Sequence, residues 1–462
     1  MTLRSQVAKH SARLVQILLK KLTKGGSSLP GKIAKKLDPA ILAELGKNYR
    51  VVIITGTNGK SVTTALTVNI LRQKFDEVLT NDTGSNLEQG IISTFLNANS
   101  KGQGDNIAVL EVDEASVRHI TEYINPEVIL VTNLFRDQLD RFGEIYTTFD
   151  YILEGANKSP KSLLLMNGDA PIFASRDFHH NVAYFGFSNS DKSTDKMAHY
   201  NTDGVLCPRC EHILHYHMIT YSNLGDYFCP NCQFHRPSLT YSVDQVDKLT
   251  PETSTFTIEG QSFTIPVAGL YNIYNALAAY SIARYLGLSQ TAIHEGLQGA
   301  KRMFGRQEAL NIHGKDTRIN LIKNPVGFNQ IVSLLELDQE EFSLLVLLND
   351  NPADGQDISW IWDGMFENIA QLPNLKATAV GGIRVKDLKV RMQVAGFDED
   401  HLKELSNSQE ALQWIASVPS QKVYVLATYT AMLDFRRELA DQHLVKERMK
   451  SWSLELAISM AI

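Results

Sequence analysis

An apolar strand that runs directly into a glycine-containing loop restricts this chain to few folds. Residues 51–61 read Val-Val-Ile-Ile-Thr-Gly-Thr-Asn-Gly-Lys-Ser, and a helical pattern follows them. The two glycines let backbone N–H groups approach anionic oxygens, the lysine adds positive charge, and the serine hydroxyl can ligate magnesium. We therefore predict an α/β fold whose loop binds ATP and Mg²⁺. The predicted nucleotide-binding residues of the loop and the helix after it are Gly56, Thr57, Asn58, Gly59, Lys60, Ser61 and Thr63.

The phosphate loop is a short variant of the common pattern. Ile54 occupies the position of the first glycine in the longer Gly-x-x-x-x-Gly-Lys-Ser/Thr pattern. The alternative interpretation is a turn glycine followed by a surface lysine. The strand before the loop and the helix after it favour the phosphate loop.

Composition indicates an ordinary globular protein of two or three domains. The chain has 462 residues, of which 44% are hydrophobic and 21% charged. No apolar run approaches the ~20 residues of a membrane span, and the N-terminus has no cleavage-site pattern. We therefore expect a cytoplasmic protein.

The N-terminal segment, residues 1–44, is expected to be helical and basic. Residues 1–36 contain nine Lys or Arg and no Asp or Glu, although the whole chain has a formal net charge of -6. Two interpretations stay open: contact with a membrane surface or a phosphate-rich substrate, and a solvated face of the first domain. The expected helix carries the apolar residues Val7, Leu14, Leu18 and Leu19 beside the basic residues Arg4, Lys9, Arg13, Lys20 and Lys21.

Apolar strand-like runs alternate with helical patterns along most of the chain. This alternation predicts a doubly wound α/β domain over residues 45–310 and a smaller α/β domain over residues 311–462. A hairpin is expected over residues 256–267 and a helix over residues 271–287. The expected strands are 107–112, 128–131, 162–166 and 182–187 in the first domain, and 342–348, 377–380 and 423–427 in the second.

The four cysteines of the chain form two Cys-Pro-x-Cys knuckles, separated by eighteen residues. This spacing is typical of a tetrahedral zinc ribbon, which we place at about residues 201–238. Neighbouring histidines are expected to be exposed loop residues. The predicted zinc ligands are Cys207, Cys210, Cys229 and Cys232.

Carboxylates and amides follow two of the predicted strands. Glu111 ends the first strand and precedes Asp113 and Glu114, so that one of these carboxylates can hold magnesium at the edge where the nucleotide should lie. The next strand leads to three further candidates for positioning the reactants, which are Asn133, Asp137 and Asp140.

With these motifs, the chain resembles the Mur ligase family over about residues 45–310. The resemblance implies ATP-driven conversion of a carboxylate to an acyl phosphate, which an amine then attacks. It also implies magnesium ligation by Ser61 and Glu111, phosphate contacts by Lys60 and Arg306, and a contact of Asn272 on the adenine side. Asn133 and Asn275 are further predicted nucleotide-binding residues. The matching segments are 55–61, Glu111, 132–133, 136–143, 269–279 and 305–308.

Departures from the amino-acid-adding members point to a narrower group. Gln138 stands where those ligases have a histidine, and residues 322–325 replace their usual motif after the central domain. No room precedes the loop for a domain that grips a UDP-linked precursor. With the four-cysteine insertion and residues 348–363, the chain resembles the MurT group, the ATP-using subunits of lipid II isoglutaminyl synthases. Such a subunit amidates the α-carboxylate of D-glutamate in lipid II, with ammonia from a glutaminase partner, GatD.

An acid-rich segment follows the expected strand 342–348. The resemblance suggests that one of its acids completes a Cys-His-acid triad in the glutaminase partner. Asp354 is the first candidate and Asp357 the second. The alternative is that these acids cap a helix beginning near Trp360. The acids of the segment are Asp350, Asp354, Asp357 and Asp363.

Two other functions stay open at this point. One is a Mur-type ligase that adds an amino acid. The other is a nucleic-acid-binding ATPase that uses the zinc ribbon and the basic N-terminus. The ribbon is not notably basic, which argues against the second.

Overall fold

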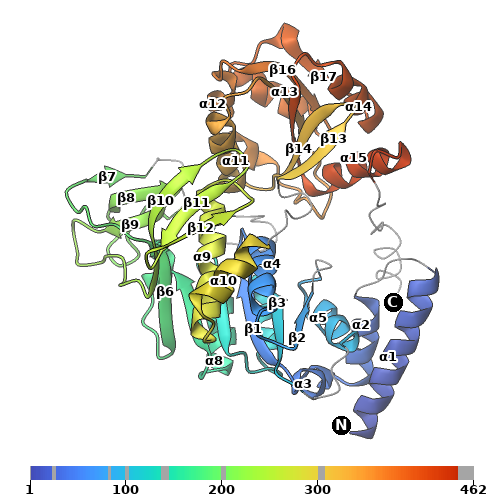
Figure 1. The fold of residues 1–462 in the computed structure, drawn as a ribbon, viewed down its shortest axis with the longest axis vertical. Helices are drawn as coiled ribbons and strands as arrows, with labels where there is room; N and C mark the ends of the chain where they lie inside the picture. The colour runs from blue at the N-terminus through green and yellow to red at the C-terminus, as the bar shows by residue number, and fades with distance from the viewer. Residues whose placement is uncertain are drawn as a thin grey trace.

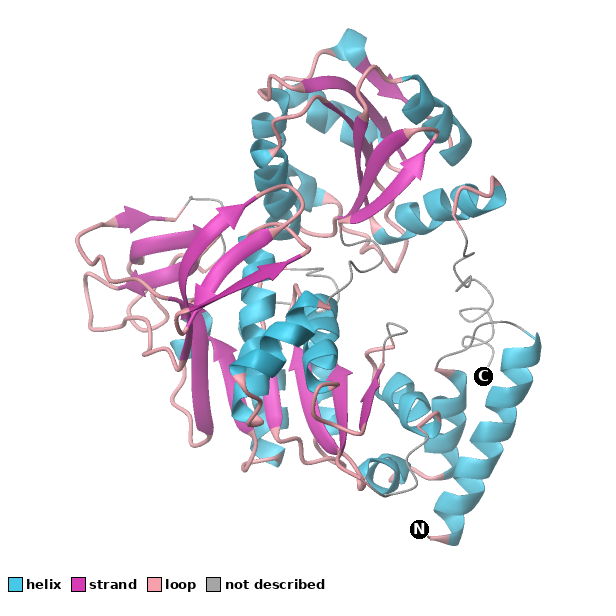
Figure 2. Ribbon diagram, in the orientation of Figure 1, coloured by secondary structure: helices cyan, strands magenta, loops and turns pink. Residues whose placement is uncertain are grey.

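The structure is a computed structural model. It describes residues 2–22, 28–81, 85–98, 104–136, 145–198, 204–299 and 307–445. These residues form three sheets of nine, six and three strands. Figures 1 and 2 show the nine-stranded sheet in the centre, the six-stranded sheet in a separate C-terminal domain, and the three-stranded sheet at one side.

The central sheet runs in the order β12-β11-β10-β6-β5-β4-β1-β3-β2. From β2 to β10 neighbouring strands are parallel, and β10, β11 and β12 are antiparallel. The innermost strands are apolar throughout because helices cover both sides of a parallel sheet. The strands are β1 (Arg50–Thr55), β2 (Glu77–Thr80), β3 (Asn106–Glu111), β4 (Val128–Val131), β5 (Leu163–Asn167), β6 (Asn181–Phe187), β10 (Tyr241–Leu249), β11 (Ser254–Ile258) and β12 (Gln261–Ile265).

The predicted α/β fold is confirmed, and the central sheet has two strands that had not been predicted, β2 and β10. The expected hairpin is β11 and β12, joined by Glu259 and Gly260, which both have positive φ. This two-residue turn matches the twist of the flanking strands. Strand β10 is mostly polar and joins the hairpin to the sheet beside β6.

Helices α4 (Lys60–Leu71), α9 (Leu270–Tyr285) and α10 (Gln290–Gln298) pack against one another on the central sheet (Figure 1). Gly296 makes the contact between α10 and α4 close, since a Cβ there would lie 2.5 Å from the Cα of Ile70. The other helical segments of this domain are α5 (Glu88–Leu96), η1 (Glu114–Ser116), α6 (Val117–Ile120), α8 (Ile145–Lys158) and η2 (Pro171–Ala174).

The cysteine-containing insertion forms the three-stranded sheet β7 (Lys196–Met197), β8 (His215–Tyr221) and β9 (Leu224–Phe228). A buried carboxylate, Asp169, anchors it to the central domain. Asp169 accepts hydrogen bonds from Arg236 of the insertion (2.7 Å) and from the hydroxyl of Tyr274 on α9 (2.6 Å). The insertion is therefore joined to the helix that carries Asn272 and Asn275.

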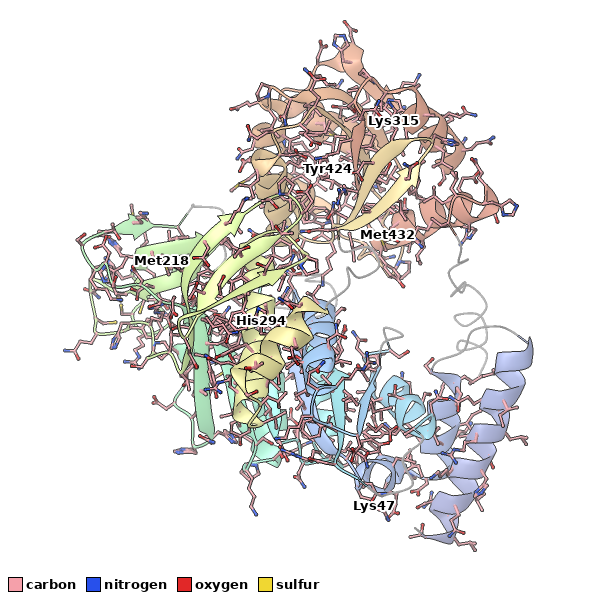
Figure 3. All side chains as sticks on the ribbon, viewed as in Figure 1. Lys47, Met218, His294, Lys315, Tyr424 and Met432 are labelled. Carbon is pink, nitrogen blue, oxygen red and sulfur yellow. The ribbon has the colours of Figure 1, made fainter. Side chains whose placement is uncertain are left out.

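The C-terminal domain contains the second sheet, in the order β13-β14-β18-β15-β16-β17. All pairs are parallel except β13 with β14. Tyr424 on β18 lies in the interior of this domain (Figure 3). Its elements are β13 (Glu308–Ile312), β14 (Lys315–Leu321), α11 (Pro325–Leu337), β15 (Phe342–Leu347), η3 (Ser359–Trp362), α12 (Phe366–Ala370), β16 (Leu375–Gly381), α13 (Val385–Val394), η4 (Glu399–His401), β17 (Leu402–Glu404), α14 (Ser408–Ser417), β18 (Lys422–Ala427) and α15 (Tyr429–Asp441).

Three N-terminal helices lie beyond the β2 edge of the central sheet: α1 (Leu3–Leu22), α2 (Leu29–Leu37) and α3 (Ile41–Gly46). Figure 1 shows α1 outermost, with α2 and α5 between it and the sheet. Among the helices that the structure describes, none has the length and apolar character needed to cross a bilayer.

Candidate active site

The phosphate loop connects β1 to α4 and requires glycine at two positions. Gly56 and Gly59 have φ values of 123° and 86°. A Cβ on Gly56 would lie 2.3 Å from the Thr132 hydroxyl oxygen, and one on Gly59 would lie 2.1 Å from the side-chain oxygen of Asn275. A residue with a Cβ would be strained at these positive φ values and would clash with these side chains, so both positions require glycine. The loop is thus pressed against two polar side chains and opens toward the first turn of α4.

Lys60 is held in place at the start of α4. Its ammonium donates to the carbonyl of Gly56 and, over 2.8 Å, to the carboxylate of Glu114. Burial by itself would lower the pKa of Lys60, but the carboxylates of Glu114, Glu111 and Asp113 raise it above the ordinary value. Lys60 therefore stays a cation at the point where backbone N–H groups and a helix N-terminus favour anions.

Asn133, which follows β4, fixes the loop from the neighbouring strand. Its side-chain oxygen accepts from the backbone N–H of Asn58 (2.9 Å), and its amide group donates to the carbonyl of Asn58 (3.0 Å). The Thr132 hydroxyl donates to that same carbonyl (2.8 Å). Asn133 thus positions the phosphate loop through its backbone.

Asn272 and Asn275 lie one turn apart on α9 and belong to a chain of hydrogen bonds. Thr63 of α4 donates to Asn275 (3.2 Å), Asn275 donates to Asn272 (3.1 Å), and Asn272 donates to the carbonyl of Ala268 (2.8 Å). Three of the predicted nucleotide-binding residues therefore form one connected buried network beside the loop.

The C-terminal domain reaches the phosphate loop through two residues at the end of β14. Lys323 donates to the carbonyl of Thr57 (3.2 Å), and Asn324 donates to the side-chain oxygen of Asn58 (3.2 Å). Asn324 also caps α11 by accepting from the N–H of Gly327 (2.8 Å). The N-terminus of α11 therefore faces the loop, and both domains contribute residues around it.

A cleft between the domains adjoins the loop, with about 910 Å³ of space not filled by atoms, including its open mouth. Asn320, on β14, is 2% exposed in this cleft, and neither atom of its amide has a hydrogen-bond partner among the described residues. Tyr221, from the cysteine-containing insertion, forms part of the wall and packs edge-on against Tyr274 with ring centroids 5.7 Å apart. A buried amide without a partner is costly, which makes Asn320 a candidate ligand-binding residue.

The carboxylates after β3 lie at the predicted edge of the sheet. Glu111 is half-buried, and its backbone N–H donates to the side chain of Asn81 (2.9 Å). It pairs with Ile54 in the strand register, so it borders the end of β1 and the start of the loop. The hydroxyl of Ser61 and the carboxylate of Glu111 are hard oxygen donors that fit Mg²⁺. Glu114, by contrast, is buried and accepts a hydrogen bond from the ammonium of Lys60.

The four cysteines form the metal-ligand cluster expected from their spacing. Their sulfur atoms all lie within 4.8 Å of one another, with Cys207 and Cys232 3.6 Å apart and Cys210 and Cys229 3.5 Å apart. A tetrahedron with Zn–S bonds of ~2.3 Å has edges of roughly 3.8 Å. The donor set and its spacing fit zinc.

Asp354 and Asp357 follow β15 and are not among the residues that line the cleft at the phosphate loop. Asp354 is 5% exposed and accepts from the backbone N–H of Thr430 at the start of α15 (2.7 Å) and from that of Asn351 (3.2 Å). Burial raises its pKa, although these hydrogen bonds lower it. Asp357 is exposed and accepts from the N–H of Ser359 (2.8 Å), which lowers its pKa.

The helix expected near Trp360 requires a correction. Residues 359–362 form only the 3₁₀ turn η3, and α12 begins at Phe366. Asp357 caps the backbone just before this turn, as the alternative interpretation held.

The structure brings most of the predicted site together. Asn58, Gly59, Asn272 and Asn275 line one cleft, and hydrogen bonds join Thr63 and Asn133 to it. Glu111 borders the start of the loop, and the cysteines and the acid segment form two further groups. Arg306, Asp137 and Asp140 lie outside the described residues.

Several residues of the cleft had not been singled out from the sequence. The strand-end position of Asn320 and the Asn-Pro helix start at Asn324 were available signals, whereas nothing local marks Tyr221, which reaches the cleft only through tertiary structure. The residues are Tyr221 and Asn320. Lys323 and Asn324 had been noted within the segment 322–325 but without their contacts to the phosphate loop, and Glu114 had been grouped with Glu111 without its bond to Lys60.

Comparison with solved structures shows the Mur ligase fold. The chain is similar to MurF from Acinetobacter baumannii, with a TM-score of 0.64, 17% identity and coverage of 90% of this chain and 80% of that one. It is also similar to a pseudomurein peptide ligase type C from Methanothermus fervidus, with a TM-score of 0.63, 20% identity and coverage of 87% and 80%.

Sequence comparison gives a narrower relationship. Residues 54–283 match the family model of the Mur ligase middle domain, and residues 321–432 match that of the MurT ligase C-terminal region. The chain is 46% identical to the lipid II isoglutaminyl synthase (glutamine-hydrolyzing) subunit MurT of Streptococcus pneumoniae over 97% of this chain and 100% of the relative. It is 35% identical to the subunit of the same name from Staphylococcus aureus, over 85% and 88%. The chain, with its phosphate loop, cysteine cluster and C-terminal domain, therefore belongs to the MurT family of Mur ligase-like proteins.

Proposed function

We propose that this chain is the ATP-using ligase subunit of a lipid II isoglutaminyl synthase in peptidoglycan synthesis. It would amidate the α-carboxylate of D-glutamate in the stem peptide of lipid II, giving D-isoglutamine. The observation that carries the proposal is the inter-domain phosphate site around Lys60, in a chain nearly half identical to a MurT subunit over almost its full length.

The reaction needs two steps that the cleft can support. An oxygen of the substrate carboxylate attacks the γ-phosphorus of ATP, the bond to ADP breaks, and an acyl phosphate forms. Ammonia then attacks the acyl carbon, phosphate leaves, and loss of a proton gives the amide. Phosphoryl transfer depends mainly on positioning and charge neutralisation, so no covalent chemistry is required of this chain.

The residues of the cleft divide these tasks. The loop N–H groups and Lys60 bind phosphate oxygens, Glu114 orients the Lys60 ammonium, and Asn133 fixes the loop. Ser61 and Glu111 would hold Mg²⁺, which when bound neutralises charge that develops on the phosphates. Asn320 and the network of Asn272 and Asn275 face the nucleoside end of the cleft, and Arg306 would contact the transferring phosphate.

Ammonia would come from a separate glutaminase subunit of the GatD kind, in a heterodimer that acts at the cytoplasmic side of the membrane. Glutaminases of the cysteine class need a nucleophilic thiol. All four cysteines of this chain lie in one cluster that fits zinc, so none is left for that role. The C-terminal domain would contact the partner, with Asp354 completing its triad and Asp357 as the second candidate.

The test is ATP-dependent conversion of lipid II by the purified chain, followed by mass spectrometry of the peptide. We expect ammonium to support a fall of one mass unit, and glutamine to do so only with the glutaminase subunit present. A gain equal to an amino-acid residue would overturn the proposal and identify an amino-acid-adding ligase.

Asn320→Leu should weaken nucleotide binding without destabilising the chain. The substitution removes an amide that has no partner in the protein, so the free energy of unfolding of the free chain should rise by about 1 kcal/mol. Loss of a contact to the nucleotide should raise the Kd for ADP roughly tenfold or more, measured by calorimetry.

Asn324→Leu is the matched control. Asn324 is equally buried but bonded to Asn58 and Gly327, so its replacement should lower the free energy of unfolding. If Asn320→Leu bound ADP like the unaltered chain, Asn320 would have no part in the site.

Cys229→Ser should remove zinc and weaken nucleotide binding together. Loss of a ligand releases the metal, and the insertion that carries Tyr221 then loses its fixed geometry. Losing one aromatic contact should raise the Kd for ADP roughly tenfold. Metal content by elemental analysis and ADP titration check the two effects.

Tyr221→Ala is the control, because it should weaken ADP binding similarly while zinc content stays unchanged. Full zinc content in Cys229→Ser would refute the proposed ligand set.

A further inference from the structure

Within the described part of the chain, helix α1 has an exposed apolar face. Leu3, Val7, Leu14 and Ile17 are 79%, 52%, 61% and 54% exposed. Their spacings of four, seven and three residues place them on one side of the helix. On an ordinary surface helix such a stripe faces the protein core.

The opposite side of α1 makes the contact with the protein. Ser5, Ala8, Ala12 and Gln16 repeat at spacings of three and four residues, and all are at most 7% exposed. Small side chains there allow close packing on α2, whose Ala34 is also fully buried. Ser5 further donates to Asp38 at the end of α2 (2.6 Å). The helix is therefore docked through its small residues, and its large apolar residues are left outward.

Basic side chains flank the apolar face. Arg4 lies to one side of it and Lys9 and Arg13 to the other, by helical position. Arg4 is exposed, whereas Lys9 and Arg13 are partly buried. Residues 1–36 contain nine Lys or Arg and no acidic residue, in a chain whose formal net charge is -6. On α1, positive charge therefore borders the apolar face on both sides, and Arg4 and Arg13 each also donate to a backbone carbonyl, of Leu37 and Leu96.

We propose that α1 lies in the interface of an anionic lipid bilayer, with Leu3, Val7, Leu14 and Ile17 among the acyl chains and the flanking basic residues at the phosphates. An apolar helix face bordered by Lys and Arg is the pattern of an interfacial helix, and each basic residue adds attraction to anionic lipid. Only the purpose of membrane binding rests on the proposed function, because a lipid-linked substrate would be reached at the membrane surface.

The test is co-sedimentation of the full chain with vesicles made of equal parts phosphatidylglycerol and phosphatidylcholine. The unaltered chain should bind these vesicles, bind pure phosphatidylcholine much less, and dissociate as salt is added. The double substitution Val7→Glu with Leu14→Glu should weaken binding roughly tenfold or more. The matched control replaces Val390 and Val394 of α13, 51% and 65% exposed, with glutamate and should bind normally.

Three outcomes would overturn the proposal. One is unchanged vesicle binding by the α1 variant, and another is equal loss in the α13 control. The third is no vesicle binding by the unaltered chain, together with self-association or a lower melting temperature in the α1 variant, which would mean that protein covers the face. If the glutamates prevent folding, Val7→Ser with Leu14→Ser should still weaken binding.

Failure of the proposed function is distinguishable from failure of this inference. Lys60→Ala should bind vesicles like the unaltered chain even though it is inactive. The α1 variant should keep its turnover on substrate dissolved in detergent and lose it on substrate embedded in vesicles.

Discussion

Lys60→Ala is expected to lower ATP-dependent amidation by about 10³-fold or more. Lys60 is the largely buried cation of the phosphate loop, with its ammonium fixed by Glu114 at 2.8 Å. Without it, charge that moves onto the β- and γ-phosphates would lose its main protein counter-charge. Product amide and released ADP, both measured with ammonium as the nitrogen source, check the expectation without involving a partner.

The same substitution should also destabilise the chain, and the two effects can be separated. Lys60→Ala leaves Glu114, whose side chain is 7% exposed, as a buried carboxylate without its partner, which costs up to several kcal/mol. Adding Glu114→Gln removes that charge and should restore most of the free energy of unfolding. A doubly substituted chain that is stable but inactive would locate the effect in catalysis. Turnover within a few-fold of the unaltered chain would contradict the proposed role.

The pH dependence of the Lys60–Glu114 pair follows from the direction of the pKa shift. Burial lowers the pKa of Lys60, but the surrounding carboxylates raise it by more than burial lowers it. The pKa is therefore above the ordinary value. A raised pKa means that the stabilising effect of the pair is fully present below the unfolded pKa and is lost only as pH rises through the folded one. The pair is therefore intact throughout the neutral range.

The phosphate loop and the innermost strands could be predicted because their local chemistry leaves little choice. A loop that wraps phosphate needs glycine at Gly56 and Gly59, and a sheet covered on both sides needs continuous apolar strands such as β1 and β4. Cysteine spacing likewise predicted the cluster at Cys207. In each case the signal lies within a few neighbouring residues.

The rest of the site depends on contacts between distant segments. Tyr221 enters the cleft because the insertion is anchored at Asp169, and Lys323 meets Thr57 because the C-terminal domain folds back over the loop. Strand β10 is mostly polar because it lies near the sheet edge, so periodicity gave no signal. These features depend on contacts between segments that are far apart in the sequence, and local residue patterns do not predict such contacts.

Asp354→Asn is expected to separate the two nitrogen sources. With a co-purified glutaminase subunit, glutamine-dependent amidation should fall by about 10³- to 10⁴-fold, because an acid that orients a catalytic histidine would be neutralised. Amidation with ammonium salts should stay within about twofold, since Asp354 lies outside the phosphate cleft. A parallel assay of glutamate release from glutamine locates the defect in the partner's reaction.

The position of Asp354 supports this expectation. The strands β14, β18 and β15 are parallel neighbours, so the residues after them share one edge of the sheet. Lys323 and Asn324, after β14, contact the phosphate loop at that edge, and Asp354 follows β15. Gly355, with φ of 89°, turns the chain directly after Asp354. A glutaminase docked there would release ammonia on the side of the domain that faces the acyl phosphate.

The alternative is that Asp354 only holds its own domain together, because it accepts hydrogen bonds from the backbone N–H and the hydroxyl of Thr430. Asparagine keeps the contact with the Thr430 N–H through its oxygen, but its amide group replaces the oxygen that accepts from the Thr430 hydroxyl and from the N–H of Asn351. Asp354→Asn therefore removes the charge and part of this hydrogen bonding, and the hydrogen bonding needs its own control. Thr430→Val removes the hydroxyl contact but keeps the carboxylate, and Asp357→Asn changes the exposed neighbour; both should retain most glutamine-dependent activity. If Asp354→Asn lost ammonium-dependent activity equally, or Asp357→Asn alone lost the glutamine-dependent reaction, Asp354 would not be the acid that serves the partner.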